Sequence, residues 1–193
     1  MELSISSKSS HLNKKTYLNL RWIGIIGQFI TINFVAFFFK FEFNFILANV
    51  VVFLGVLSNL YLFYFFNKNQ LQENISLLFL ILDILQLSFL LYLTGGIINP
   101  FSLFLIIPSI FASNSLSIKT NILLIFLTIS LIILLTFFHY ELPHPLNNYV
   151  FNKYYYYSVP IALIVALIFL NFFALTFGNE SKIRKDALDK IQE

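Results

Sequence analysis

The chain has 193 residues, of which 59% are hydrophobic and 11% are charged, and its formal net charge is +3. Since soluble globular domains carry about 25% charged residues, this composition excludes that class and indicates a polytopic membrane protein. Cysteine is absent, which excludes disulfides and thiolate metal sites. The small net charge does not indicate nucleic-acid binding, and we expect no nucleic-acid partner.

Six long apolar stretches follow one another along the chain, each of about 17–24 residues, which is enough to cross a hydrocarbon core as a helix. The apolar runs are continuous and do not alternate with polar residues, which excludes membrane-spanning strands. The sequence therefore predicts an all-α bundle of six transmembrane helices. We expect the spans at about 20–39, 43–66, 75–93, 101–117, 121–140 and 154–177.

The positions of lysine and arginine predict the orientation in the membrane. With the N-terminus inside, Lys40 and Lys153 lie outside and the other ten of the 12 basic residues are cytoplasmic, Arg21 and Lys68 among them. Cytoplasmic segments of membrane proteins are enriched in lysine and arginine. We therefore expect both termini in the cytoplasm.

Polar segments flank the predicted spans. Residues 1–19 form a cytoplasmic leader, rich in serine and lysine at its start, that we expect to be disordered. After the last span, 178–193 combines an apolar stripe at helical spacing with acid-to-base pairs at i,i+4. This pattern predicts the start of a cytoplasmic signalling helix, and its alternative is a frayed basic tail at the lipid surface. Four tyrosines, 154–157, are typical of an aromatic belt at the outer interface.

Asp83 is the only carboxylate inside a predicted span. A charge at that depth is costly, so the side chain should be neutral, paired or turned to the bundle interior. Gln86 lies one turn further on and is placed to hydrogen-bond it. Two interpretations remain open: an intramembrane switch, or a structural clamp with an amide side chain of another helix. The candidate partners for such a clamp are Gln28, Asn33 and Asn59.

Sequence signatures of catalysis and metal binding are weak or absent. His139, Glu141 and His144 lie near one another in the predicted outer loop, but their spacing suits no standard ligand set, and we expect no metal site. The chain contains no nucleophile elbow, Walker loop or zinc-protease motif. We therefore expect no catalytic residues.

The sequence LTGGIINPF, residues 93–101, separates the third and fourth predicted spans. Gly95 and Gly96 are placed to end the third helix in the left-handed conformation. Asn99 suits the N-cap of the fourth helix, and Pro100 suits its first position. These residues predict a tight turn on the outer side of the membrane.

The tip of this turn is apolar. Ile97 and Ile98 favour lipid, so we expect the turn to dip into the membrane interface. A helix N-terminus there offers unpaired N–H groups with positive dipole character, which suits a lipid-soluble molecule with carbonyl acceptors. We expect the Asn99 amide to contact such a headgroup and the Phe101 ring to pack on it.

The same residues resemble a known family. TGGIINPF fits the Gly-Gly-x-x-Asn-Pro-Phe heptad of the RegB/PrrB membrane-bound redox-sensing histidine kinases, and LRWIGIIGQ (20–28) and LDILQL (82–87) are similar to the family's first helix and to the approach to the heptad. The resemblance covers about residues 20–177. It implies a sensor domain in the bacterial inner membrane that reads the respiratory quinone pool. It also implies ubiquinone binding at Gly95, Gly96, Asn99, Pro100 and Phe101.

The resemblance also implies a homodimer, a response regulator as partner and a kinase part beyond these residues. Family members continue into a phosphorylated-histidine helix, a redox cysteine and an ATP-binding domain, whereas this chain has no histidine after His144. We therefore expect the sensor part of such a kinase, a homodimer that is inactive alone and reaches a response regulator only through the kinase part. The alternative is a six-helix substrate-binding subunit of a vitamin or micronutrient transporter, which has a similar length and number of spans.

Overall fold

The computed structural model describes residues 12–38 and 42–140 and, in the last helical segment, residues 157, 159–161, 163–168, 170–172 and 174–175. The expectations for residues 1–11, for the outer loop with Glu141 and His144, for Tyr154–Tyr156 and for the tail 178–193 lie outside the described residues.

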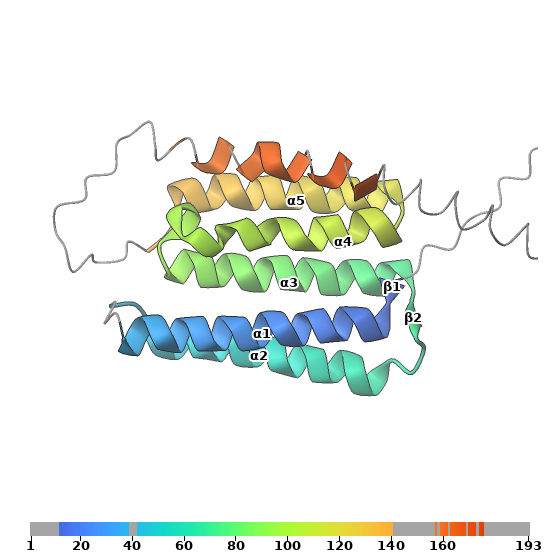
Figure 1. Ribbon diagram of the computed structural model, residues 1–193, viewed down its shortest axis with the longest axis horizontal. Helices are drawn as coiled ribbons and strands as arrows, with labels where there is room; N and C mark the ends of the chain where they lie inside the picture. Colours follow the sequence, from blue (N-terminus) through green and yellow to red (C-terminus); the bar gives the residue numbers. More distant parts are fainter. Residues whose placement is uncertain are drawn as a thin grey trace, which may run out of the picture.

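The described part of the chain is helical almost throughout (Figure 1). Two antiparallel strands, Leu12–Asn13 (β1) and Gln70–Leu71 (β2), form a short ladder in which Leu12 lies opposite Leu71. The α-helices are α1 (Lys14–Phe37), α2 (Phe45–Phe65), α3 (Glu73–Leu93), α4 (Ile107–Ser115) and α5 (Ile118–Phe137). Two 3₁₀ helices, η1 (Gly96–Ile98) and η2 (Pro100–Ile106), connect α3 to α4.

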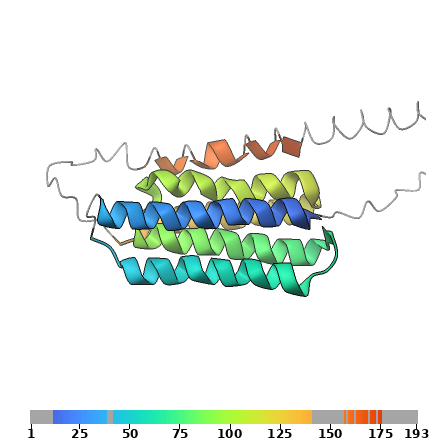
Figure 2. The ribbon, with the colours of Figure 1, turned by 60° about the horizontal axis from the view of Figure 1, so that its bottom comes forward.

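The helices lie side by side with nearly parallel axes (Figures 1 and 2). Two hydrophobic clusters form the core. One joins α3, α4 and α5 to the last helical segment through residues such as Ile84, Leu124 and Leu167. The other packs α1 and α2 against the C-terminal end of α3 through residues such as Ile25 and Val52. The first cluster also contains Tyr17 and Leu18 of α1 and Leu62 of α2, so the α1–α2 hairpin contributes to both clusters.

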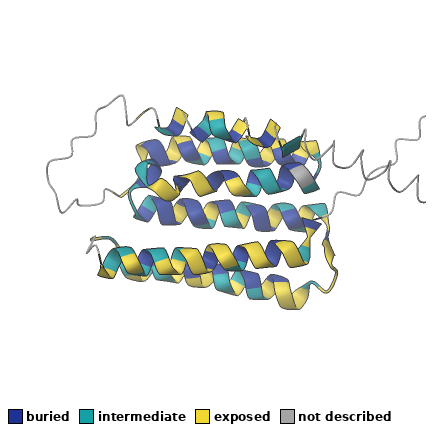
Figure 3. Ribbon diagram, in the orientation of Figure 1, coloured by how far each residue is buried: buried dark blue, intermediate teal, exposed yellow. Residues whose placement is uncertain are grey.

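The outer faces of the bundle are apolar. Large side chains such as Phe37 and Phe126 are 71% and 70% exposed, and exposed positions recur along every helix in Figure 3. By length and composition α1, α2, α3 and α5 are able to cross a membrane, whereas the apolar helical stretches Pro100–Ser113 and Val159–Phe172 are shorter. The all-α prediction is confirmed for the described residues. The number of six spans and the cytoplasmic termini stay predictions.

The N-terminal boundary differs from the expected one. Instead of a disordered leader up to residue 19, Leu12 is fully buried and pairs with β2. Asn13 caps α1 by accepting a hydrogen bond from a backbone N–H of the first turn at 3.1 Å, and Lys14 donates to carbonyl groups at the end of α2. These contacts place the residues before α1 and the α2–α3 connection at the same end of the bundle, as the charge pattern requires.

Candidate functional site

The turn between α3 and η2 follows the geometry that its residues predict. Gly95 (φ 99°) and Gly96 (φ 65°) both adopt the left-handed conformation directly after α3. Asn99 Oδ1 accepts a hydrogen bond from the backbone N–H of Phe101 at 2.9 Å, and Pro100 is the first residue of η2. The glycine ending, the asparagine cap and the proline start are therefore confirmed.

Two features of the turn differ from expectation. Ile97 is fully buried in the cluster of α3–α5, so the expectation that it faces lipid is wrong: η1 directs this side chain into the bundle. The backbone of Gly96 is covered by His139, whose Cγ would lie 2.4 Å from a Cβ at this position. Gly96 is thus required for the close approach of His139.

The polar atoms of Asn99 are used within the turn. Its Nδ2 donates to the Thr94 carbonyl oxygen and to the Thr94 hydroxyl, both at 2.9 Å, while Oδ1 accepts from Phe101. A side-chain amide has two N–H donors, and both have partners here. Asn99 therefore holds the turn together and has no amide N–H left for a ligand.

A cavity of about 1280 Å³ lies between α1 on one side and α3, η2 and α4 on the other. We call it the α1–α3 groove. It is bounded by residues of α1 between 17 and 35, of α3 and the turn between 80 and 101, and of η2 and α4 between 104 and 111. Most of the expected site residues meet in this groove: Asp83, Gln86, Gly95, Asn99, Pro100 and Phe101. Gly96 is the exception, because it lies behind His139.

An ionic network lies at the end of the groove away from the turn. Asp83 Oδ1 accepts from Arg21 Nε at 2.9 Å and lies 2.9 Å from Arg21 Nη2, while Oδ2 accepts from the Tyr17 hydroxyl. Arg21 also donates to Ser58 at 2.9 Å and to Asn59 at 3.3 Å on α2. The network therefore connects three helices within the apolar bundle.

The Asp83 clamp has partners that the sequence analysis did not assign to it. The clamp interpretation predicts an amide partner, and this is wrong: Asp83 is paired with Arg21, whose side chain is only 5% exposed. The expectation that the carboxylate is neutral, paired or turned inward is met by this pairing, and the switch interpretation stays a prediction. The charge pattern predicts a cytoplasmic Arg21, because this residue stands at the start of the first apolar run. The sequence does contain a signal for this pairing: Arg21 and Asp83 are a base and an acid in or beside apolar spans, and such residues pair inside membranes.

Gln86 belongs to a second polar contact. Among the described residues it forms no hydrogen bond with Asp83; its Nε2 donates to Gln28 Oε1 at 3.1 Å and to the Val51 carbonyl oxygen at 3.4 Å. A Cβ at position 55 of α2 would lie 2.4 Å from Gln86 Nε2, so the glycine there makes room for the carboxamide. This contact bridges α1 and α3 across the groove.

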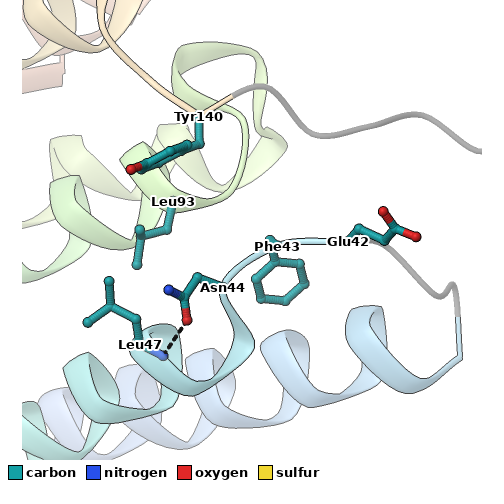
Figure 4. A pocket seen from close by; sticks show the side chains of 6 residues that line it. All are labelled: Glu42, Phe43, Asn44, Leu47, Leu93 and Tyr140. Atoms are coloured by element: carbon teal, nitrogen blue, oxygen red, sulfur yellow. Dashed lines mark hydrogen bonds between the residues drawn. The ribbon is translucent and has the colours of Figure 1, made fainter.

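A smaller pocket of about 250 Å³ lies where the α1–α2 hairpin meets the end of α3 (Figure 4). Its lining residues are Glu42, Phe43, Asn44, Leu47, Leu93 and Tyr140. Asn44 Oδ1 accepts from the backbone N–H of Leu47 at 3.0 Å as the cap of α2. The Asn44 oxygen thus has a structural role.

Among the described residues, no group of three His, Cys, Asp or Glu side chains is placed to hold a metal.

The amino-acid sequence is similar to that of a known sensor kinase. The chain is 28% identical over 178 residues to the sensor histidine kinase RegB of Cereibacter sphaeroides, and the match covers 90% of this chain and 38% of that relative. The chain thus spans well under half the length of the relative. No family model matches the chain, and no solved structure matches it.

Proposed function

We propose, from its similarity to a RegB-type N-terminal domain, that the chain is the membrane-embedded input domain of a sensor histidine kinase and reads the quinone pool of a bacterial inner membrane. In this proposal, ubiquinone binds in the α1–α3 groove, with the outer turn as one of its walls. A homodimer passes the state through the last helix to a kinase part, which acts on a response regulator. The extent of the similarity favours this sensor over the transporter-subunit alternative.

One observation carries the proposal: four of the five expected turn residues line the same cavity as the polar side chains of Asp83 and Gln86. Pockets for small organic ligands usually measure about 300–1,000 Å³ and have apolar walls with a few polar groups. The α1–α3 groove, at about 1280 Å³, exceeds that range and accommodates a ring together with the first part of an isoprenoid tail. Phe101 and Phe104 are stacked on the groove wall, with ring centroids 5.8 Å apart, and offer an aromatic surface to a flat headgroup.

The groove is also placed to transmit a signal. Ile107 and Phe111 of α4 line it, and α4 contacts the last helical segment through the hydrogen bond from Asn171 Nδ2 to Ser109 Oγ, 3.1 Å long. A ligand that changes the spacing of α1 and α4 thereby acts on the helix that leads toward the kinase part. A quinone offers carbonyl acceptors and a quinol offers hydroxyl donors, so the two forms bind with different free energies and shift the conformational equilibrium differently.

Alanine substitution of Phe101 tests the site. We expect Phe101→Ala to weaken ubiquinone binding to the chain in lipid nanodiscs about two- to tenfold, because an aromatic pair contributes about 0.5–1.5 kcal/mol. Phe126→Ala is the matched control, since Phe126 is 70% exposed on α5 and lies outside the groove. Equilibrium titration with ubiquinone gives the affinities.

Asn99→Asp provides the companion variant, because it keeps the capping oxygen and loses the donor to Thr94. We expect it to loosen the turn and to weaken binding less than Phe101→Ala does. Equal affinities for the wild type, Asn99→Asp and Phe101→Ala would contradict a site at the turn, and an absence of saturable binding by the wild type would contradict quinone sensing by this chain.

A further inference from the structure

We infer that the quinone headgroup is held from α1, by the Gln28 amide and the Thr31 hydroxyl inside the groove, and that the turn supplies its apolar wall. The inference rests on the proposed quinone site and specifies which hydrogen bonds recognise the ligand. Gly24, Gly27, Gln28 and Thr31 all line the groove, and their i, i+3, i+4 and i+7 spacing places them on one face of α1.

Asn99, Pro100 and Phe101 do not supply the donor that this recognition requires. Both amide hydrogens of Asn99 are bound to Thr94, and Pro100 has no backbone N–H. The backbone N–H of Phe101 donates to Asn99. These three residues of the heptad therefore shape the groove without offering a free hydrogen bond to a carbonyl.

Gln28 offers such a donor at a fixed position. Its Oε1 accepts from Gln86 Nε2 at 3.1 Å, and Gln86 is itself held against the Val51 carbonyl and the backbone of Gly55. The contact through Oε1 orients the carboxamide, and Gln28 Nε2 donates to no group among the described residues. An amide donor in apolar surroundings gains free energy when it finds an acceptor, and a quinone carbonyl is an acceptor.

Space for the ring lies beside this donor. A Cβ at Gly24 or at Gly27 would meet no heavy atom within 4 Å, so the groove-facing side of α1 is open at both positions. Thr31 lines the same face one turn beyond Gln28, and its hydroxyl has no hydrogen-bond partner in the described part of the chain. A hydroxyl donates and accepts, so Thr31 serves a quinone carbonyl as well as a quinol hydroxyl.

Isosteric substitution of Gln28 tests the inference. The probe is a short-chain ubiquinone with ¹³C-labelled ring carbonyls, bound to the 193-residue chain in nanodiscs and observed by infrared difference spectroscopy and by titration. A carbonyl that accepts a hydrogen bond absorbs at lower frequency than a free one. We expect Gln28→Met to reduce this downshift to the part that the Thr31 hydroxyl contributes, and to raise Kd about three- to tenfold, the effect of one hydrogen bond.

The matched control is Asn33→Leu, which removes an amide from the same helix outside the groove, where Asn33 contacts Asn49 at 3.2 Å. This variant should keep the downshift and the affinity. Thr31→Val is a second isosteric variant that leaves the Gln28–Gln86 contact intact, and we expect it to weaken quinol binding at least twofold, an effect of the size of one hydrogen bond.

The possible outcomes distinguish a failure of the headgroup contact from a failure of quinone binding itself. If Gln28→Met and Thr31→Val keep both the wild-type carbonyl frequency and the wild-type affinity, the headgroup contact is wrong while the groove remains the quinone site. If the wild type shows no saturable binding, the proposed function fails and the inference fails with it. Loss of the downshift in Asn33→Leu would also overturn the inference, because it would show an indirect effect through the packing of α1.

Discussion

Replacing Asp83 by asparagine should lower the free energy of unfolding by about 3–5 kcal/mol, the cost of removing one partner from a buried ion pair. The Arg21 side chain is 5% exposed, and Asp83 is the acid it pairs with. Asparagine keeps the shape of the side chain but loses the negative charge, so the buried guanidinium keeps hydrogen bonds to neutral groups such as Ser58 and Asn59 but has no counter-charge. Unfolding of the purified chain in mixed micelles, followed as a function of denaturing detergent, measures the change.

A double variant provides the control for Asp83. Arg21→Met with Asp83→Leu removes both charges, and replacement of a whole buried ion pair by apolar residues is often nearly neutral. We therefore expect the double variant to be more stable than Asp83→Asn. A single variant as stable as the wild type would contradict a stabilising ion pair between Arg21 and Asp83.

Replacing Gly96 by alanine should also destabilise the chain strongly. The left-handed conformation at φ +65° costs an L-residue about 1–2 kcal/mol. The added Cβ would lie 2.4 Å from His139 Cγ and 2.7 Å from His139 Cβ. Because the position of a Cβ atom is fixed by the backbone, side-chain rotation alone cannot relieve the second overlap. Overpacking of this kind costs about 1–3 kcal/mol, so a total of about 2–5 kcal/mol is expected by the same unfolding measurement.

Two comparisons separate strain from overlap at Gly96. Gly24→Ala adds the same methyl group where no heavy atom lies within 4 Å, and helix propensity predicts unchanged or slightly raised stability. Adding His139→Gly to Gly96→Ala removes the overlap, because both the Cγ and the Cβ of His139 are then absent, but keeps the strain. The double variant should therefore lose less stability than the two single losses combined. Full additivity would contradict the packing of His139 on Gly96.

The parts of the site that the sequence predicted correctly depend on local chemistry. The left-handed glycines, the Asn99 cap and the Pro100 start follow from rules that involve residues within one turn of each other. The apolar character of the helices follows from composition. In each case, neighbouring residues carry all the information that the prediction needs.

The parts that the sequence did not predict depend on contacts between distant residues. The pairing of Arg21 with Asp83, and of Gln28 with Gln86, depends on which faces of α1 and α3 meet, and the two apolar runs do not specify those faces. The inward direction of Ile97 depends on the left-handed turn before it. The ladder between β1 and β2 involves only two residues on each strand, too few to give an alternating pattern.

Photolabelling tests the occupancy of the α1–α3 groove most directly. The chain in nanodiscs is irradiated with a ubiquinone analogue that carries an azido group on its ring, and the modified peptides are mapped by mass spectrometry. A quinone in the groove predicts adducts on residues 24–31 of α1 and on residues 98–104, all lost when unlabelled ubiquinone is added in excess. Adducts confined to the exposed face of α5 around Phe126, or adducts that persist in the presence of the competitor, would contradict a quinone site in the groove.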